Sequence, residues 1–191
     1  MLGSDNPRRG AERPCRAALR AFGACSSSPR SADKHVAATM STTISLKSVV
    51  LALETLTDDS WGHVNRVTGE VWVVGREEWQ MVDADDVPDN LPSWQYELVA
   101  KANEIYTSAD WLRLPRKFDI HEWDIMDRFA ASLEAESSRS LRGCLRGKGA
   151  FHRFHSRIRQ LGVEAAWFRF RNDALENIAR TCLEDHGLPY K

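Results

Sequence analysis

Residues 61–74 read WGHVNRVTGEVWVV, and this stretch decides the kind of fold that the chain adopts. Its Val and Trp residues favour strands because β-branched and aromatic side chains pack well on a pleated surface. Gly69, after Thr68, supplies the positive φ that a tight turn between two antiparallel strands requires. The stretch therefore predicts a β-hairpin with strands at Trp61–Val67 and Glu70–Val74.

The segment before this hairpin predicts an amphipathic helix. Its apolar residues recur every three or four positions, which places them on one helix face, and Ser45 is placed to cap the first turn. They are Leu46, Val49, Val50, Leu53 and Leu56.

The middle of the chain predicts alternating helices and extended segments. Residues 77–89 are acidic and precede Pro92, which indicates a loop with a short strand at 79–82. The apolar spacing over 93–106 indicates a helix. Residues 111–114 alternate and stop at Pro115, as an edge strand does. Asp119 and Glu122 match a capping box that opens a helix with Met126, Phe129 and Leu133 on its buried face. A polar break at 134–140 is expected to end that helix.

The last third predicts further helices around the tripeptide Gly147-Lys148-Gly149, which we interpret as a hinge or a cap. Phe151, Phe154, Ile158 and Leu161 define one helix that stops at Gly162. Residues 167–170 alternate like a short strand. Asp173 is expected to cap a final helix that Gly187 closes.

Together these elements predict one α+β domain over 41–191, with a small antiparallel sheet packed against about five helices. The whole chain has 191 residues, of which 42% are hydrophobic and 28% charged, as in globular domains. Its longest apolar runs are far shorter than the roughly 20 residues of a membrane span. We therefore expect no membrane partner.

Residues 1–40 contain few large apolar side chains and show no periodicity, so we expect a disordered leader. Three interpretations stay open. Met40 is the natural start and the upstream residues are a mis-assigned leader, or the segment is an organellar presequence, or it is a functional basic tail.

The net charge of −1 conceals an uneven distribution along the chain. Residues 41–136 carry 19 acidic and 8 basic side chains, whereas residues 137–191 carry 11 basic and 5 acidic ones. Between Ser137 and Arg171 nine Arg and Lys residues accompany a single acid, Glu164. The sequence therefore predicts a positive surface over residues 139–171.

One part of this surface is a candidate anion site. A glycine-rich break before a helix offers free N–H groups, and nearby cations add charge-assisted contacts. The alternative is that the glycines only let two helices pack closely, and the spacing does not match a P-loop. Phe151, Phe154 and Phe168 are interpreted as core residues. The candidate anion-binding residues are Lys148, Gly149, Arg146, Arg153, Arg157, Arg159 and His152.

The order of these pieces resembles a known family. The hairpin around Thr68-Gly69-Glu70-Val71, the segment Leu112–Pro115, the run Gly147–Phe154 and the segment Trp167–Phe170 are similar to the bacterial uncharacterised protein family numbered 0158. The resemblance covers about Leu46–Leu188, and Gly-Lys-Gly-Ala-Phe is its most specific piece. It implies a bacterial cytosolic protein that starts at Met40, and it supplies no active site.

The function expected from these patterns is non-enzymatic binding of an anionic partner such as RNA or DNA. A second hypothesis is a protein–protein adaptor or homodimer in which the acidic and basic parts meet, within one chain or between two. A third is an enzyme that acts on a phosphorylated small molecule near Lys148. We expect no cofactor and no metal, and we interpret Cys144 and Cys182 as reduced, packed thiols in a cytoplasmic protein.

Overall fold

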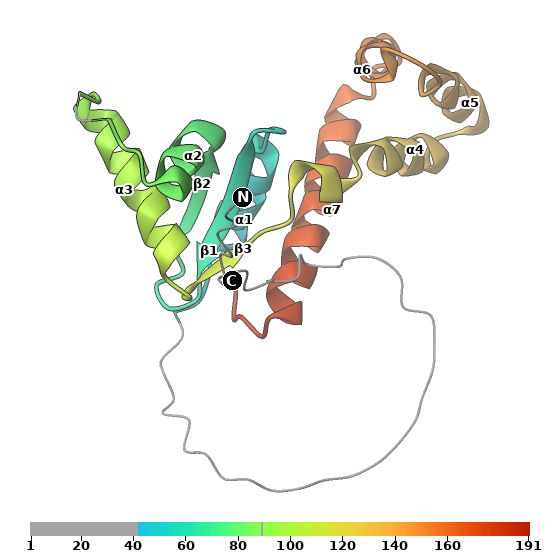
Figure 1. Ribbon diagram of the computed structural model, residues 1–191. Coiled ribbons are helices and arrows are strands. Elements are labelled where there is room, and N and C mark those ends of the chain that lie inside the picture. Colours follow the sequence, from blue (N-terminus) through green and yellow to red (C-terminus); the bar gives the residue numbers. More distant parts are fainter. Residues whose placement is uncertain (1–41, 89) are drawn as a thin grey trace, which may run out of the picture.

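A computed structural model describes residues 42–88 and 90–191 and shows an α+β fold (Figure 1). The predicted hairpin is present, with β1 at Ser60–Asn65 and β2 at Val71–Gly75, but β1 ends two residues earlier than expected, so the turn is longer than the predicted Thr68-Gly69 turn. Gly69 has a φ of 75°, and the Asn65 side-chain oxygen accepts hydrogen bonds from the backbone N–H groups of Val67 and Thr68, both at 2.9 Å. The interpretations of residues 1–40 lie outside the described residues.

The predicted edge strand completes the sheet. β3, at Trp111–Arg113, pairs antiparallel with β1 on the side opposite β2, so the strand order is β2-β1-β3. Val64 in the central strand lies opposite Val71 on one side and Leu112 on the other. Because side chains alternate along a strand, these three residues line one face of the sheet.

Helices cover both faces of the sheet (Figure 1). On the Val64 face lies α1, at Leu46–Thr55, and the Oγ atom of Ser45 caps it by accepting from the Ser48 N–H at 3.3 Å. On the other face lie α2, at Arg76–Ala84, and α3, at Ser93–Thr107, around a second apolar cluster. That cluster contains Val74, Ala102, Ile105 and Trp111, with Trp72, Trp79 and Val82 packed against it.

His63 lies within the aromatic side of the sheet and is only 5% exposed. Its imidazole stacks on Trp79 with 5.6 Å between ring centres, and its Nδ1 has no hydrogen-bond partner among the described residues. Burial, together with the nearby Arg113 guanidinium, lowers the pKa of His63 to about 4, although a hydrogen bond with the Trp61 backbone opposes the shift. The imidazole is therefore neutral near pH 7.

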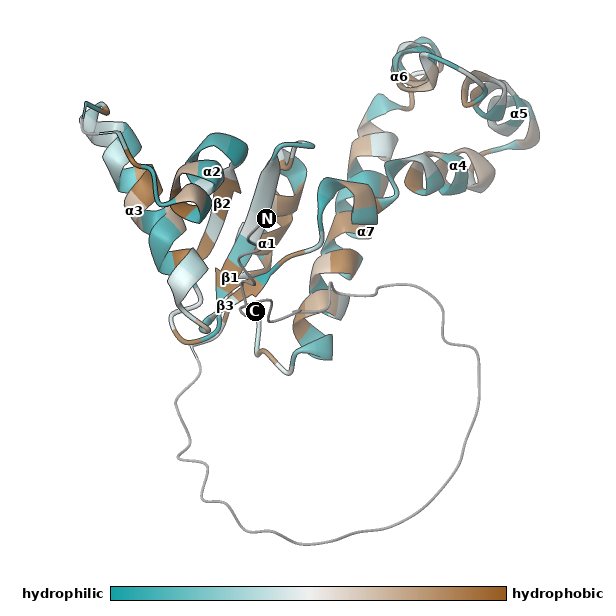
Figure 2. Ribbon diagram, viewed as in Figure 1, coloured by the Kyte–Doolittle hydropathy of each residue, from teal (hydrophilic) through white to brown (hydrophobic). Residues whose placement is uncertain are grey.

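The second half of the chain is helical. A short 3-10 helix, η1, at Lys117–Ile120, leads into α4 at Glu122–Ser132, α5 at Ala135–Cys144, α6 at Ala150–Gln160 and α7 at Glu164–Asp185. α7 packs beside α1 and also contacts α4 and α6. Figure 2 shows apolar stretches on α1, the sheet and the middle of α7, where the main core forms.

Residues from both ends of the described chain pair with each other. Ile44 forms a parallel bridge with Tyr190, supported by hydrogen bonds from Ile44 N to Pro189 O at 2.9 Å and from Lys191 N to Ile44 O at 3.0 Å. The Leu46 N–H also donates to the Lys191 carbonyl at 3.0 Å. The start of α1 is therefore tied to the segment that follows α7.

Two segments expected to be loops are helices. Residues 77–89 were predicted as a loop with a strand at 79–82, but α2 occupies Arg76–Ala84, with Glu77 and Glu78 favourably placed in its first turn. The predicted polar break at 134–140 is wrong as well, because α5 spans most of it. α5 buries a single apolar side chain, Leu141, and its largely polar composition is what favoured a loop.

Two further predictions are wrong at the ends of helices. The strand expected at 167–170 and the cap expected at Asp173 both lie inside α7, which runs unbroken from Glu164. Asp119 does not begin α4; it belongs to η1 and accepts a hydrogen bond from the Arg116 N–H at 3.0 Å. His121, in a left-handed conformation, separates η1 from α4.

No helix among the described residues has the length and apolar character needed to cross a membrane.

Candidate functional site

The structure brings the predicted basic residues together in a unit formed by α5, the connection 145–149 and α6, which we call the basic end. Residues 135–160 carry seven Arg and Lys side chains and one acid, Glu136. The basic end and the α2–α3 pair lie on opposite sides of the molecule, with the sheet, α1 and α7 between them (Figure 1). The cations of the basic end and the acids of the α2–α3 pair thus lie on different sides of the molecule, while the acids of α4 lie next to the basic end.

The connection between α5 and α6 depends on its two glycines. Gly147 and Gly149 have φ values of 73° and 76°, a region that other residues enter at a cost of about 1–2 kcal/mol. A side chain added at Gly147 would meet nothing within 4 Å, so close helix packing is not what requires that glycine. Gly149 is the N-cap residue of α6, and the N–H groups of the first turn follow it.

Arg153, one of the candidate anion-binding residues, contacts the backbone of the connection. Its guanidinium donates hydrogen bonds to the backbone carbonyls of Arg146 and Lys148, and it reaches the Gly147 carbonyl at 3.5 Å. These carbonyls follow α5, where no intrahelical donor remains for them. Arg153 therefore fixes the shape of the connection, and its charge stays at the surface.

The other two arginines of α6 make different contacts. The Nε atom of Arg157 donates to the Ser140 hydroxyl at 2.6 Å, which links α6 to α5, and its Nη1 donates to Gln160 at 2.9 Å. Arg159 forms an ion pair with Glu164, with 3.0 Å between Nε and Oε1. Arg157 thus contributes an uncompensated charge, whereas Arg159 is neutralised by its partner.

Three cations of the basic end have neither an ion pair nor a side-chain hydrogen bond within the described parts of the chain. Arg139 lies on α5, and Arg146 and Lys148 lie on the connection that follows it; all three are exposed. His152, in the first turn of α6, is also exposed. These side chains are available to an anion from solvent.

The aromatic residues of this region divide into core and surface. Phe154 is fully buried, as predicted, and its ring lies 4.9 Å from that of Trp167. The prediction is wrong for Phe151 and Phe168, which are 50% and 53% exposed. Phe151 is the second residue of α6, so its ring lies directly after the cationic connection.

The basic end is held on the rest of the molecule by apolar packing and one backbone contact. Leu141, Leu145, Phe154 and Ile158 point into the main core. The Trp123 indole on α4 donates to the Leu145 carbonyl at 3.3 Å, where α5 ends. These buried side chains anchor the backbone of α5 and α6 that carries the cations.

Some basic side chains do meet acidic ones within the chain. Arg142 forms a two-pronged pair with Asp127 on α4, and Arg171 on α7 pairs with Glu122 at 2.5 Å and with Glu54 at 3.4 Å. Burial alone would raise the pKa of Glu122, but Arg171 and Lys117 outweigh it and hold that pKa below its usual value. The intramolecular match of acids and bases thus involves α4 and α1, while the acids of α2 and α3 face elsewhere.

The described residues offer little for catalysis at the basic end. No group of three or more His, Cys, Asp or Glu side chains among them is arranged to hold a metal ion. The Cys144 thiol is half-buried and donates to the Ser140 carbonyl at 3.4 Å, and Cys182 is buried in the core. The arrangement suits the binding of an anion by several spaced cations.

No family model, curated protein or solved structure matches the chain. The resemblance to the bacterial family numbered 0158 therefore stays a prediction.

Proposed function

We propose that the chain is a non-enzymatic nucleic-acid-binding protein whose basic end contacts the phosphate backbone. The observation that carries the proposal is the group of exposed cations without acidic partners, namely Arg139, Arg146 and Lys148, within a unit that holds seven basic side chains and one acid. Each cation that neutralises a phosphate releases counterions, which supplies affinity without any contact to a base.

The exposed ring of Phe151 favours a single strand over a duplex. An unpaired base presents its flat face to an aromatic side chain, and such stacking contributes about 1–3 kcal/mol per base. Phe151 lies within the same short stretch as Arg146 and Lys148, so a base and its neighbouring phosphates fit one site. We therefore propose single-stranded RNA or DNA as the partner class, in the cytoplasm, where thiols stay reduced.

Fluorescence anisotropy with a labelled single-stranded oligonucleotide of mixed sequence tests the proposal. We count four phosphate contacts, from Arg139, Arg146, Lys148 and Arg157. On a single strand the plot of log Kd against log salt concentration then has a slope of about 2.8, so affinity falls about fifty-fold between about 50 and 200 mM salt. A matched duplex and a polyanion such as heparin serve as competitors. If heparin and the unlabelled strand compete equally well, charge alone accounts for the affinity, and the proposed stacking of a base on Phe151 is refuted.

Variants separate the proposed contacts from the structural ones. Arg146→Gln combined with Lys148→Gln removes two exposed charges and leaves the Arg153 contacts to the backbone in place, so we expect the salt slope to fall by about 1.4. Phe151→Ala lowers affinity for the single strand and leaves the slope unchanged. Arg159→Gln is the matched control, because Glu164 already neutralises that charge. No binding at about 50 mM salt would overturn the proposal.

A further inference from the structure

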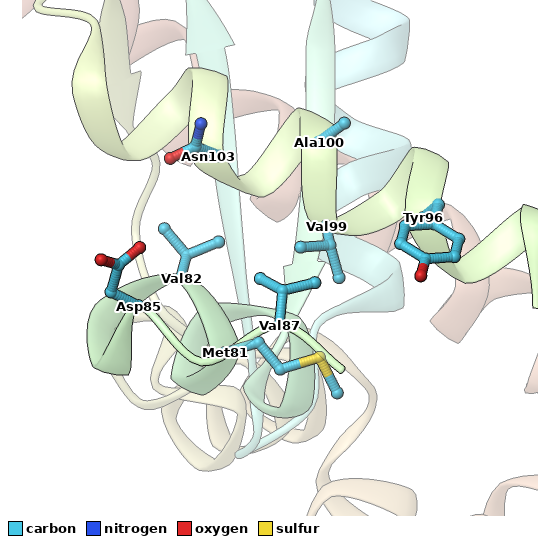
Figure 3. Close-up of a pocket in the computed structure, with 8 residues that line it drawn as sticks. All are labelled: Met81, Val82, Asp85, Val87, Tyr96, Val99, Ala100 and Asn103. Atoms are coloured by element: carbon cyan, nitrogen blue, oxygen red, sulfur yellow. The ribbon is translucent and has the colours of Figure 1, made fainter. Parts of the chain in front are cut away.

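A groove of about 280 Å³ opens between α2 and α3, on the far side of the sheet from the basic end. Figure 3 shows Val82 of α2 and Val99 of α3 facing each other across it, with Val87 of the connecting segment at its centre. Three polar residues, Asp85, Tyr96 and Asn103, lie at its edges. The apolar lining consists of Met81, Val82, Val87, Val99 and Ala100.

Hydrogen bonds within the chain hold the shape of this groove. The Tyr96 hydroxyl donates to the Pro88 carbonyl at 3.1 Å, and the Tyr106 hydroxyl donates to the Asp83 carboxylate at 3.1 Å. These two bonds tie α3 to the end of α2 and to the segment after it. Val87 nevertheless stays 41% exposed, so apolar surface faces solvent inside a formed concavity.

One acidic residue, Asp85, lines the groove, and the part of the chain that forms it is rich in acids. Residues 76–110 carry nine Asp and Glu side chains against two basic ones. Both basic side chains are already paired, Arg76 with Asp59 and Lys101 with Glu70 and Glu104. The chemistry that fits is therefore an apolar side chain flanked by cations.

The chain itself presents such a side chain. Phe151 is half-exposed on the basic end, and Arg146, Lys148 and Arg153 surround the turn that precedes it. The basic end and the groove lie on opposite sides of the molecule, so Phe151 cannot enter the groove of its own chain (Figure 1). A second copy of the chain presents this same apolar and cationic surface.

We infer that the protein self-associates head to tail, with Phe151 of one copy in the α2–α3 groove of the next. Each copy then offers one groove and one basic end, so the contact is heterologous and propagates unless the rotation closes a ring. Charge complementarity across the contact makes it sensitive to salt. The same Phe151 surface is proposed to bind single strands, so the two interactions exclude each other.

Sedimentation velocity on the full chain, freed of nucleic acid with nuclease, tests this inference. The weight-average mass of the wild type should rise above the 21.6 kDa of one chain as concentration increases, and fall when salt is added. Val87→Arg places a cation in the groove, and Phe151→Glu replaces the apolar ring on the basic end with a carboxylate. Both positions are exposed, and a carboxylate suits the first turn of α6, so both variants are expected to fold.

Mixing the two variants gives the decisive result. Each variant alone should be monomeric, because one lacks a working groove and the other lacks the aromatic side chain. The Val87→Arg chain keeps Phe151 and the Phe151→Glu chain keeps the groove, so an equimolar mixture should form a dimer of twice the monomer mass and nothing larger. Leu51→Arg, an exposed apolar position on α1, is the matched control and should associate like the wild type.

Several outcomes would overturn the inference. These are a wild type that stays monomeric at every concentration, a single variant that associates as the wild type does, or a mixture that stays monomeric. Val87→Arg separates this inference from the proposed function, because it should bind single strands with unchanged affinity. If Val87→Arg loses self-association but still binds single strands, the result supports the groove as the contact. If neither Val87→Arg nor the wild type binds nucleic acid, only the proposed function fails.

Discussion

Lowering the pH from 7 to 5 should destabilise the protein through His63, because the folded state resists protonation of this imidazole. The pKa of His63 is about 4 in the folded protein, against about 6.5 in an unfolded chain. The unfolded state therefore binds more protons below pH 6.5, so stability is fully present above pH 6.5 and declines as the pH falls toward 4. From these two values the loss between pH 7 and pH 5 is about 2 kcal/mol.

Urea unfolding followed by tryptophan fluorescence at pH 7 and pH 5 measures this loss. His63→Phe keeps an aromatic ring against Trp79 and removes the titrating group, so its free energy of unfolding should change about 2 kcal/mol less than that of the wild type over the same interval. His152→Gln replaces an exposed histidine and should behave like the wild type. Equal pH dependence in the wild type and in His63→Phe would refute the reasoning.

Two further perturbations test the packing of the fold. Glu122→Gln breaks an ion pair whose side chains are only 14% and 18% exposed, so it should cost about 2 kcal/mol in urea unfolding and show coupling to Arg171→Met in a double-mutant cycle. Arg180→Ala removes a more exposed ion pair within α7 and should cost less than about 0.5 kcal/mol. Equal losses in Arg180→Ala and Glu122→Gln would contradict the role of burial. Gly69→Ala should lower the free energy of unfolding by about 1–2 kcal/mol, because the φ of this residue is 75°. Gly143→Ala, within α5, should raise the free energy of unfolding slightly. Melting temperatures that shift alike in the two variants would contradict the role of the positive φ at Gly69.

The hairpin and the first helix were predictable because their signals are local. The positive φ expected at Gly69 and the 3.6-residue period from Leu46 are both signals within one short segment, although the turn is longer than the Thr-Gly pair suggested. The third strand was also found, since its alternation ends at a proline. The α+β class follows from these elements and is confirmed.

Helices with little buried surface escaped prediction. α2 contains no buried residue and α5 contains one, and their polar composition favoured loops although their few apolar residues do share one helix face. Their helical form depends on neighbours: α2 packs on α3, and α5 packs between α4 and α6. Such tertiary support is invisible in the segment itself.

The buried face of α6 begins one residue earlier than predicted, and this difference moves Phe151 from the core to the surface. Phe154 and Ile158 fit a buried stripe that begins at Ala150 as well as one that begins at Phe151, and the structure selects Ala150. The prediction therefore placed Phe151 in the core. Only the packing of α6 against α7, with Trp167 beside Phe154, decides between the two.

The cations of the candidate site were identified as a group but not by role. Their density along 139–159 is a property of the sequence, and the structure places them on one unit. The partners of Arg159 and Arg153 lie in other segments of the chain. Glu164, at the start of α7, pairs with Arg159, and the Arg146 carbonyl, in the connection before α6, accepts a hydrogen bond from Arg153. Those contacts exist only after the chain has turned at Gly147 and Gly149.

The pairing of Ile44 with Tyr190 can form only after almost the whole chain has been synthesised. Closing a contact between residues so distant in sequence costs chain entropy that only the finished core repays. The hairpin, α2, α3 and β3 lie within 60–113 and can form the Trp-rich cluster early. α1 leaves the ribosome before them, yet it waits for α7 and for residues 188–191. Of the helices that the structure describes, α1 is synthesised first, yet its packing is complete only once α7 and residues 188–191 have followed.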